Sequence, residues 1–199
     1  MENRGMGKGV VILYFKDKAT LSNFGNECKD TSLKIVVSFK QNFMHQSVIQ
    51  YRLATKSDIP ALAVIRSKDW ETPDYWTLRI EGYMKAEIHP QKALGPRVVY
   101  LATENERVAG FIAGHLTQRF NCDGELEWID VIEQYRRKGI ASELLHMLAA
   151  WFIDHKAFTI CVNSGAENKV AHQFYKSNGA KDLQEHWLVW ENINVLLKK

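Results

Sequence analysis

The sequence has no apolar run close to the roughly 20 residues that a membrane-spanning helix requires. We therefore expect no membrane partner. Cysteines are also few: Cys28, Cys122 and Cys161 are odd in number, lie far apart and match neither a disulfide framework nor a metal-ligand pattern. A cytoplasmic chain in a reducing compartment is the simplest expectation.

The chain also lacks a large excess of positive or negative charge. The chain has 26 lysines and arginines against 23 aspartates and glutamates, which gives a formal net charge of +3 and a pI near 8.7. This small excess suits a polyanionic cofactor, but by itself it does not indicate nucleic acid as a partner. The seven histidines show no metal-site spacing, so we expect no metal ion.

The chain does have enough apolar material for a core. With 199 residues, 46% of them hydrophobic, one globular domain is the default. No internal repeat is present, and no obvious linker follows Val48. We expect the main domain over residues 48–199 and an extension of uncertain structure over residues 1–47.

The extension contains two β-prone runs, Gly9–Phe15 and Leu33–Phe39, which join no longer pattern. The first run is short and ends at Lys16 without a small-residue cleavage site, so we expect no signal peptide. Two alternatives stay open. The segment up to Phe43 is an accessory extension, or it is an upstream stretch that a native start at Met44 omits.

Residues 125–145 change from one sequence period to another. The first part alternates with a period of two, which predicts a strand. One predicted face carries Leu126 and Trp128, and the other carries Glu125, Glu127, Ile129 and Val131. Helical spacing follows in Ile140, Leu144, Leu145, Leu148 and Phe152. The change of period falls within residues 133–138.

The join between this strand and this helix is basic. Unpaired backbone N–H groups, the positive end of a helix dipole and fixed cations meet in such a turn, and together they bind phosphates. The run Arg136–Ala141 resembles the pyrophosphate loop of the GCN5-related N-acetyltransferases (GNAT): Gln or Arg, two residues, Gly, one residue, then Gly or Ala. It matches at Arg136, Gly139 and Ala141. The alternative is a connection whose charges only keep it solvated.

A second match lies downstream. Asn168, Tyr175 and Gly179 have the spacing of the closing signature of the same family, in which an Asn precedes the amphipathic helix that carries the Tyr. The resemblance covers about Val48 to Asn192. On these two motifs together, the chain is identified as a member of the family.

The pattern elsewhere predicts an α/β (α+β) chain. A strand over residues 48–54 precedes a helix that Thr55 or Asp58 caps and that has Pro60 in its first turn. The later elements complete a mixed sheet with helices on its faces. They are strands over 98–103, 108–116, 158–162 and 186–190 and a helix over 168–178. The resemblance implies the GNAT fold, whose mostly antiparallel sheet splays beside the strand that enters the phosphate turn.

Four aromatic residues, Trp70, Tyr75, Trp76 and Tyr83, lie between the first predicted helix and the next strand. In the family this region covers the acceptor site, so the resemblance implies that they line a pocket. Packing in the core is the commoner fate of aromatic residues at such spacing. Both alternatives stay open.

The resemblance implies acetyl-CoA as cosubstrate. Its pantetheine arm would pair, as a short pseudo-strand, with the backbone of the departing strand at Ile129, Asp130 and Val131. Asn168 would orient that arm or cap its own helix. The pyrophosphate would be held mainly through the backbone N–H groups of Arg136, Arg137, Lys138, Gly139, Ile140, Ala141 and Ser142.

Transfer to an amine requires a base for the amine and an acid for the departing thiolate. Glu125 lies where some protein-acetylating members of the family carry their base, and Glu127 lies two residues on, on the same predicted face. Either could act directly or through water, and the alternative for each is a solvated strand carboxylate. Asp130 is predicted on the opposite face and is a weaker candidate.

Tyr175 occupies the position from which the family protonates the thiolate, and a phenol suits a leaving group of similar basicity. The alternative is a packed helical tyrosine. Asn163 stands where members that acetylate protein N-termini often carry an acidic residue, which argues against that substrate class. Glu133 replaces a frequent proline, with little expected effect.

Two functions follow from the resemblance. The first is an enzyme that transfers an acetyl group from acetyl-CoA to a primary amine of a small molecule or protein by direct attack in a ternary complex. The second is a non-catalytic sensor or interaction domain that binds acyl-CoA. Tyr175 and the two strand glutamates favour the enzyme. The expected partners are the amine acceptor and, in a possible homodimer, a second copy of the chain; the acceptor's identity stays open.

Overall fold

The computed structural model of the chain describes residues 11–13, 35–37, 48–68, 70–87, 93–165 and 167–197. The chain divides into two compact units, Met1–Gln46 and Ser47–Lys199. Within the described residues, no helix combines the length and the apolar character needed to cross a membrane.

Two short strands are described in the first unit. β1 (Val11–Leu13) and β2 (Ile35–Val37) pair in parallel. They fall inside the two β-prone runs of the sequence. Cys28 and the alternative start at Met44 lie outside the described residues, so what the sequence indicates about them stays a prediction.

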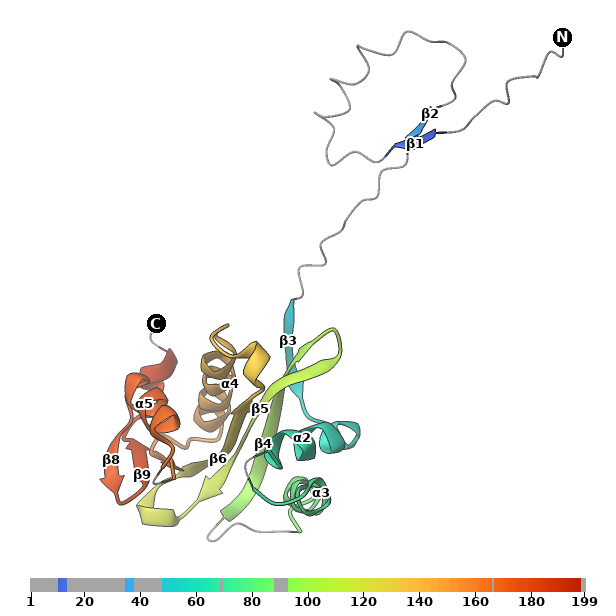
Figure 1. Cartoon of the computed structure of the whole chain (residues 1–199). Coiled ribbons are helices and arrows are strands. Elements are labelled where there is room, and N and C mark those ends of the chain that lie inside the picture. Colours follow the sequence, from blue (N-terminus) through green and yellow to red (C-terminus); the bar gives the residue numbers. More distant parts are fainter. Residues whose placement is uncertain are drawn as a thin grey trace, which may run out of the picture. The chain divides into compact units, whose positions relative to one another are not determined.

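A seven-stranded sheet forms the centre of the second unit, as Figure 1 shows. In spatial order it contains β3 (Ile49–Leu53), β4 (Ala93–Glu104), β5 (Arg107–Thr117), β6 (Gly124–Val131), β7 (Ile160–Asn163), β9 (Trp187–Trp190) and β8 (Lys181–Gln184). Neighbouring strands are antiparallel except β6 and β7, which are parallel. The predicted mixed, mostly antiparallel sheet is confirmed. The sequence does not predict β8, because all its residues are exposed and no buried face marks it.

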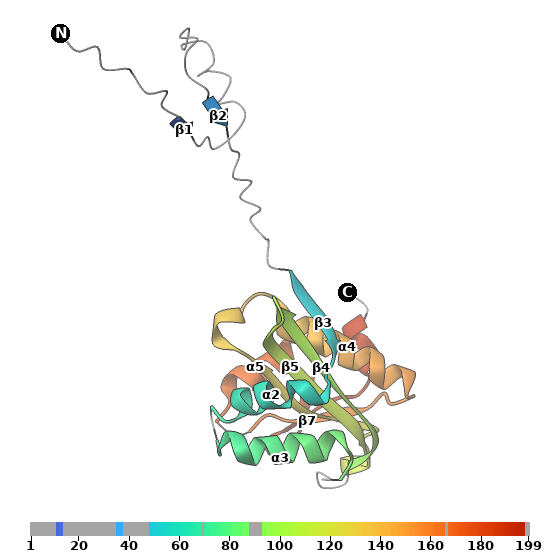
Figure 2. The same cartoon turned by 90° about the vertical axis from the view of Figure 1, so that its right-hand side faces the viewer.

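Helices cover both faces of this sheet (Figures 1 and 2). α2 (Ile59–Arg66) and α3 (Pro73–Met84) lie on one face, and α4 (Ile140–Asp154) and α5 (Lys169–Ser177) lie on the other. Each face buries its own hydrophobic core, called here the α2–α3 core and the α4–α5 core. The apolar stripe that predicts α4 is the buried side of that helix.

Of the four aromatic residues in the α3 region, two are buried in a core and two are exposed. Trp76 and Tyr83 are buried in the α2–α3 core, where both rings pack edge-on or tilted against Trp128 of β6. Trp70 and Tyr75 are exposed. For Trp76 and Tyr83 the core alternative is therefore the correct one.

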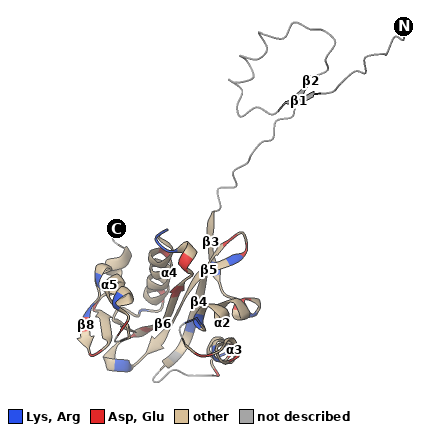
Figure 3. Cartoon of the chain, viewed as in Figure 1, with Lys and Arg blue, Asp and Glu red and all other residues tan. Residues whose placement is uncertain are grey.

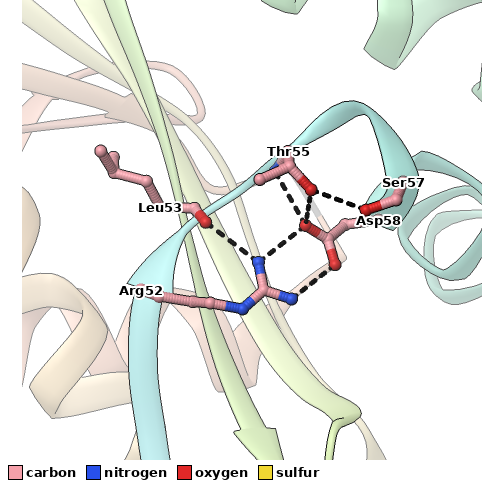
Figure 4. A network of polar contacts seen from close by, with 5 residues as sticks. All are labelled: Arg52, Leu53, Thr55, Ser57 and Asp58. Atoms are coloured by element: carbon pink, nitrogen blue, oxygen red, sulfur yellow. Dashed lines mark hydrogen bonds and ion pairs between the residues drawn. The ribbon is translucent and has the colours of Figure 1, made fainter.

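A polar network joins β3 to α2 (Figure 4). Two nitrogens of the Arg52 guanidinium donate to the two carboxylate oxygens of Asp58, each at 2.7 Å. The backbone N–H and the hydroxyl of Thr55 donate to Asp58 Oδ2, each at 2.8 Å. The Arg52 hydrogen bonds, followed by those of Thr55, lower the pKa of Asp58 to about 2 against the cost of burial. Both predicted capping residues thus fix the chain where it enters α2, and Pro60 lies in the first turn as predicted.

Candidate active site

β6 and β7 separate partway along their length. Their register runs from Gly124 beside Ile160 to Leu126 beside Val162 and ends there. β6 continues beyond this point with β5 as its partner. Residues 127–131 therefore have one edge that no described strand covers. Backbone groups on such an edge can pair with an extended ligand.

A β-bulge lies where the two strands separate. Ala113 and Gly114 of β5 pair with Trp128 and Leu126, so Glu127 is the extra residue of β6. Leu126 packs in the α4–α5 core, whereas Trp128 packs in the α2–α3 core. The prediction that Leu126 and Trp128 share a face is wrong, because a period of two does not survive an inserted residue.

The bulge also exchanges the faces of the residues that follow it. Ile129 and Val131, predicted on the face of the two glutamates, pack instead against the α4–α5 core. Gly110 of β5 lies against this part of β6, and a Cβ added there would be 2.7 Å from the backbone oxygen of Asp130. The two strands approach this closely because no side chain intervenes.

Asp130 lies on the α2–α3 side. Its Oδ2 accepts a hydrogen bond from Arg66 of α2 at 3.0 Å, and the Arg66 guanidinium lies 4.5 Å from the ring centre of Trp76. Glu127 faces the same side, because it lies near Arg79 of α3. Glu125 does so too, because it lies beside His115, which contacts Tyr83 of α3. The prediction that Asp130 faces away from Glu125 and Glu127 is therefore wrong, again because of the bulge.

The turn before α4 has two residues in the left-handed backbone region. After the short 3-10 helix Glu133–Tyr135, Arg137 has φ 63° and Gly139 has φ 80°. Glycine adopts this conformation at little cost. A Cβ at Gly139 would meet no atom within 4 Å, so backbone conformation and not packing requires the glycine. The N–H groups of residues 140–142 begin α4 and have no acceptor within the helix, which leaves them available to an anion.

The cations of this turn are exposed, and two of them have partners. Figure 3 shows the basic residues before α4 and the acidic residues on β6. Arg136 Nε donates to the Val131 carbonyl oxygen at 3.1 Å. Lys138 Nζ lies 3.8 Å from Glu104 Oε1 and over the ring of Tyr135. These contacts fasten the turn to the end of β6 and to the sheet.

The two predicted bases have different surroundings. Glu125 is buried, and its Oε2 accepts a hydrogen bond from Arg119 Nε at 2.9 Å. Glu127 Oε1 lies 3.9 Å from Arg79 Nη2 of α3, and 11% of the Glu127 side chain is exposed. Burial raises the pKa of Glu127; nearby His115 opposes this rise, and the charge of Glu125 adds to it. Glu127 therefore holds a proton more readily than an ordinary glutamate.

His115, which the sequence analysis does not single out, completes this cluster. It lies on β5 opposite Glu125 and is fully buried. Its Nδ1 is 3.1 Å from the Tyr83 hydroxyl, while its Nε2 is 3.6 Å from Glu125 Oε2 and has no hydrogen-bond partner in the described part of the chain. Side-chain atoms of His115, Glu125 and Glu127 lie within 4.8 Å of one another. These residues come from two strands, so their sequence spacing gave no sign of a possible metal site.

Tyr175 is buried on α5, and its ring centre lies 5.8 Å from that of Trp190 at an interplanar angle of 82°. Burial raises the pKa of its phenol; the charge of Asp130 raises it further, and Arg66 opposes the rise. This placement agrees with both alternatives from the sequence, a packed ring and a proton donor.

The closing signature fixes both ends of α5. Asn168 is its N-cap, since the side-chain oxygen accepts a hydrogen bond from the Ala171 N–H at 3.0 Å. Gly179 follows the helix with φ 89°, a conformation that favours glycine. The capping role of Asn168 is confirmed, and its role toward a cofactor arm stays a prediction.

Comparison with known proteins gives one family. The model of the acetyltransferase (GNAT) family matches residues 60–180. No curated protein matches the chain by sequence. Among solved structures, a putative GNAT-family acetyltransferase from Desulfovibrio desulfuricans is 13% identical, with a TM-score of 0.60 over 73% of this chain and 99% of that chain.

Two other similar structures were solved with coenzyme A. The PaiA N-acetyltransferase from Thermoplasma acidophilum is 20% identical, with a TM-score of 0.53 over 71% of this chain and 96% of that chain. The aminoglycoside N-acetyltransferase AAC(6')-Iy is 16% identical, with a TM-score of 0.59 over 69% of this chain and 91% of that chain. At these identities the likeness concerns the fold, and the predicted fold is confirmed.

Proposed function

The chain belongs to the acetyltransferase (GNAT) family, and from this premise we propose that it transfers an acetyl group from acetyl-CoA to a primary amine by direct attack. Acetyl-CoA supplies the acetyl group as an activated thioester. The residues of the chain bind this cosubstrate, accept a proton from the amine and return one to the departing thiolate.

Two features of the second unit fit acetyl-CoA. Residues 127–131 present an uncovered strand edge, which can pair with the amide groups of a pantetheine arm. The free N–H groups at the start of α4 suit a pyrophosphate, and Gly139 brings no Cβ to obstruct its approach. The solved complexes of PaiA and AAC(6')-Iy with coenzyme A support this assignment by likeness of fold.

We assign the base to Glu127. Glu125 is held by the hydrogen bond from Arg119 and is almost entirely buried, so it is poorly placed to reach an acceptor. Glu127 is partly exposed and lacks so close a partner. Its raised pKa brings the carboxylate nearer to the basicity that proton removal at neutral pH requires.

We assign proton donation to Tyr175. Its raised pKa keeps the phenol protonated at neutral pH. An acid of raised pKa would be weak toward a thiolate in water, but burial raises the pKa of a thiol as well. The two basicities therefore stay comparable when both groups are shielded from solvent.

We propose that the acceptor is a cationic primary amine, preferably of a small molecule. Glu127, whose nearest guanidinium nitrogen is 3.9 Å away, can accept a hydrogen bond from an ammonium group. Asn163, at the end of β7, accepts a hydrogen bond from the Gly165 N–H and has no carboxylate to offer a protein N-terminus. The likeness to an aminoglycoside acetyltransferase is compatible with a small-molecule acceptor.

The observation that carries the proposal is the uncovered edge of β6 beside the partly exposed, pKa-shifted Glu127. The test is to incubate the protein with acetyl-CoA and a panel of primary amines and to measure the release of free thiol. We expect release above the rate without amine for at least one acceptor. Tight acetyl-CoA binding without turnover on any amine would instead favour the acyl-CoA sensor.

A further inference from the structure

The imidazole of His115 has a polar atom that the described residues leave unsatisfied. The side chain is fully buried between β5 and α3. Tyr83 meets Nδ1, but Nε2 faces Glu125 Oε2 at 3.6 Å, too far for a hydrogen bond. Burying such a group without a partner destabilises the fold. A proton, a bound water or a metal ion could offset this cost.

The charges around the cluster argue against a metal ion. Glu125 accepts a hydrogen bond from Arg119, and Glu127 lies near Arg79. Two guanidinium groups thus already face the two carboxylates. A divalent ion would add two positive charges beside them in a buried setting, where repulsion is strong. A single proton on Nε2 adds less charge and makes an ion pair with Glu125 Oε2 at 3.6 Å.

We propose that His115 is a positioning residue of the acetyl transfer, which takes over from Glu127 the proton that an acceptor ammonium loses. The inference rests on the proposed function. In this proposal Nδ1 carries the hydrogen of the neutral ring and donates it to the Tyr83 hydroxyl oxygen, so that Nε2 is free to accept a proton. The proton moves from the ammonium nitrogen to a carboxylate oxygen of Glu127 and then through one water to Nε2, which has no hydrogen-bond partner among the described residues.

The protons balance. An ammonium acceptor brings one proton more than the amide and the thiol of the products need. His115 holds this extra proton during attack and returns it to solvent through Glu127, the member of the cluster with an exposed fraction. The second proton leaves the nitrogen after attack and balances the one that Tyr175 gives to the thiolate.

Charged groups from several elements surround the His115 ring. Glu125 and Glu127 of β6 are acidic, and Arg119 lies beside Glu125. The Arg97 guanidinium of β4 lies 4.9 Å from the ring centre of Tyr83.

The test compares His115→Gln with the parent. Glutamine places an amide near the position of Nε2 but cannot take up the proton. We expect kcat to fall about tenfold to a hundredfold with an unchanged KM for acetyl-CoA, and the acid limb of the kcat/KM profile to move to higher pH. That direction follows because His115 opposes the raised pKa of Glu127. His172→Gln, on the exposed part of α5, is the matched control and should behave as the parent.

A second readout does not need turnover. In protein labelled with carbon-13 at the glutamate carboxyl groups, the NMR titration of Glu127 should move to higher pH in His115→Gln and stay in place in His172→Gln. An unmoved Glu127 titration overturns the inference even if the parent is active. Loss of parent activity in EDTA and recovery with Zn²⁺ would also overturn it in favour of a metal site. A parent that turns over no amine defeats the proposed function, while the NMR comparison still decides the coupling.

Discussion

The role of proton donor that we assign to Tyr175 can be tested by removing one atom, the oxygen of its hydroxyl group. Its ring is buried against Trp190, and loss of the hydroxyl leaves that packing intact. A positioned general acid contributes about a hundredfold to ten-thousandfold in rate. We expect Tyr175→Phe to lower kcat by about a hundredfold or more, with acetyl-CoA affinity and melting temperature close to those of the parent.

Tyr100→Phe, which removes a half-buried hydroxyl on β4, is the matched control and should be fully active. Steady-state rates and calorimetric titration of both variants make the comparison. If Tyr175→Phe turns over within about threefold of the parent, far less than removal of a general acid costs, Tyr175 is a packed core residue and water protonates the thiolate.

At this scale the sequence shows which residues carry motifs and misses those brought together by the fold. Asn168 and Gly139 are recognisable because a cap and a left-handed turn are local. The face of the sheet on which Asp130 lies cannot be recognised from the sequence, because it depends on a bulge that is defined only by pairing with β5. His115 could have been noticed, because Phe111, Ala113 and His115 alternate on one buried face. Its partners Tyr83 and Glu125 could not, because they lie on other elements.

At the scale of elements, the turn into α4 is the proposed site of phosphate binding. We expect Gly139→Val to weaken acetyl-CoA binding about tenfold or more, because valine strains a backbone at φ 80° and projects a side chain toward the phosphate. A Cβ there meets no protein atom, so the fold should persist. Arg137→Ala should cost less, since we propose that backbone N–H groups make the main contacts. Calorimetric titration measures both, and a larger loss for Arg137→Ala would assign the binding to side-chain charge.

The junction of β3 and α2 should make stability depend on pH. The folded-state pKa of Asp58, about 2, is below its usual value of 3.8, so the stabilising contribution of the carboxylate is present above pH 4 and is lost as pH falls toward 2. The shift corresponds to about 2 kcal/mol. Because 44% of the Arg52 side chain is exposed, screening should leave about 1 kcal/mol.

We therefore expect Asp58→Asn to lower the melting temperature by about 2–4 °C at pH 7. The difference should shrink steadily between pH 4 and pH 2. Asp74→Asn, in the exposed first turn of α3, is the control and should show a smaller effect. Equal losses at pH 7 and pH 3 would mean that packing, and not the charge of Asp58, stabilises the junction.

At the scale of the whole molecule, we propose that the second unit contains everything needed for the transfer. The splayed strands, the turn into α4 and α5 all lie in Ser47–Lys199. A chain that starts at Met44 should express in soluble form, melt within a few degrees of the full chain and release thiol at a comparable rate. An insoluble or inactive product would show that residues before Met44 belong to the functional fold.

Most of the order of strands and helices could be predicted from the sequence because most elements have a buried face with the right period, but the helix α3 was not predicted. α4 shows this in its apolar stripe, and β4 and β5 show it as a hairpin. The edge strand β8 could not be predicted, because none of its residues is buried. The separation of β6 from β7 is invisible in either strand alone, since it is a property of their register; only the resemblance to a family indicates it.

The central claim is that Glu127, beside the uncovered edge of β6, serves the transfer of an acetyl group to an amine. The most direct measurement uses acetyl-CoA labelled with carbon-14 in the acetyl group and counts the label in the amine product for the parent, Glu127→Gln and Glu106→Gln. Glu106 is exposed in the turn between β4 and β5, at the end of β5 opposite to His115. We predict rapid labelling by the parent and Glu106→Gln and a fall of about a hundredfold or more in Glu127→Gln. Labelling by Glu127→Gln at the parent rate, or no labelled amine from the parent with any acceptor, would contradict the account.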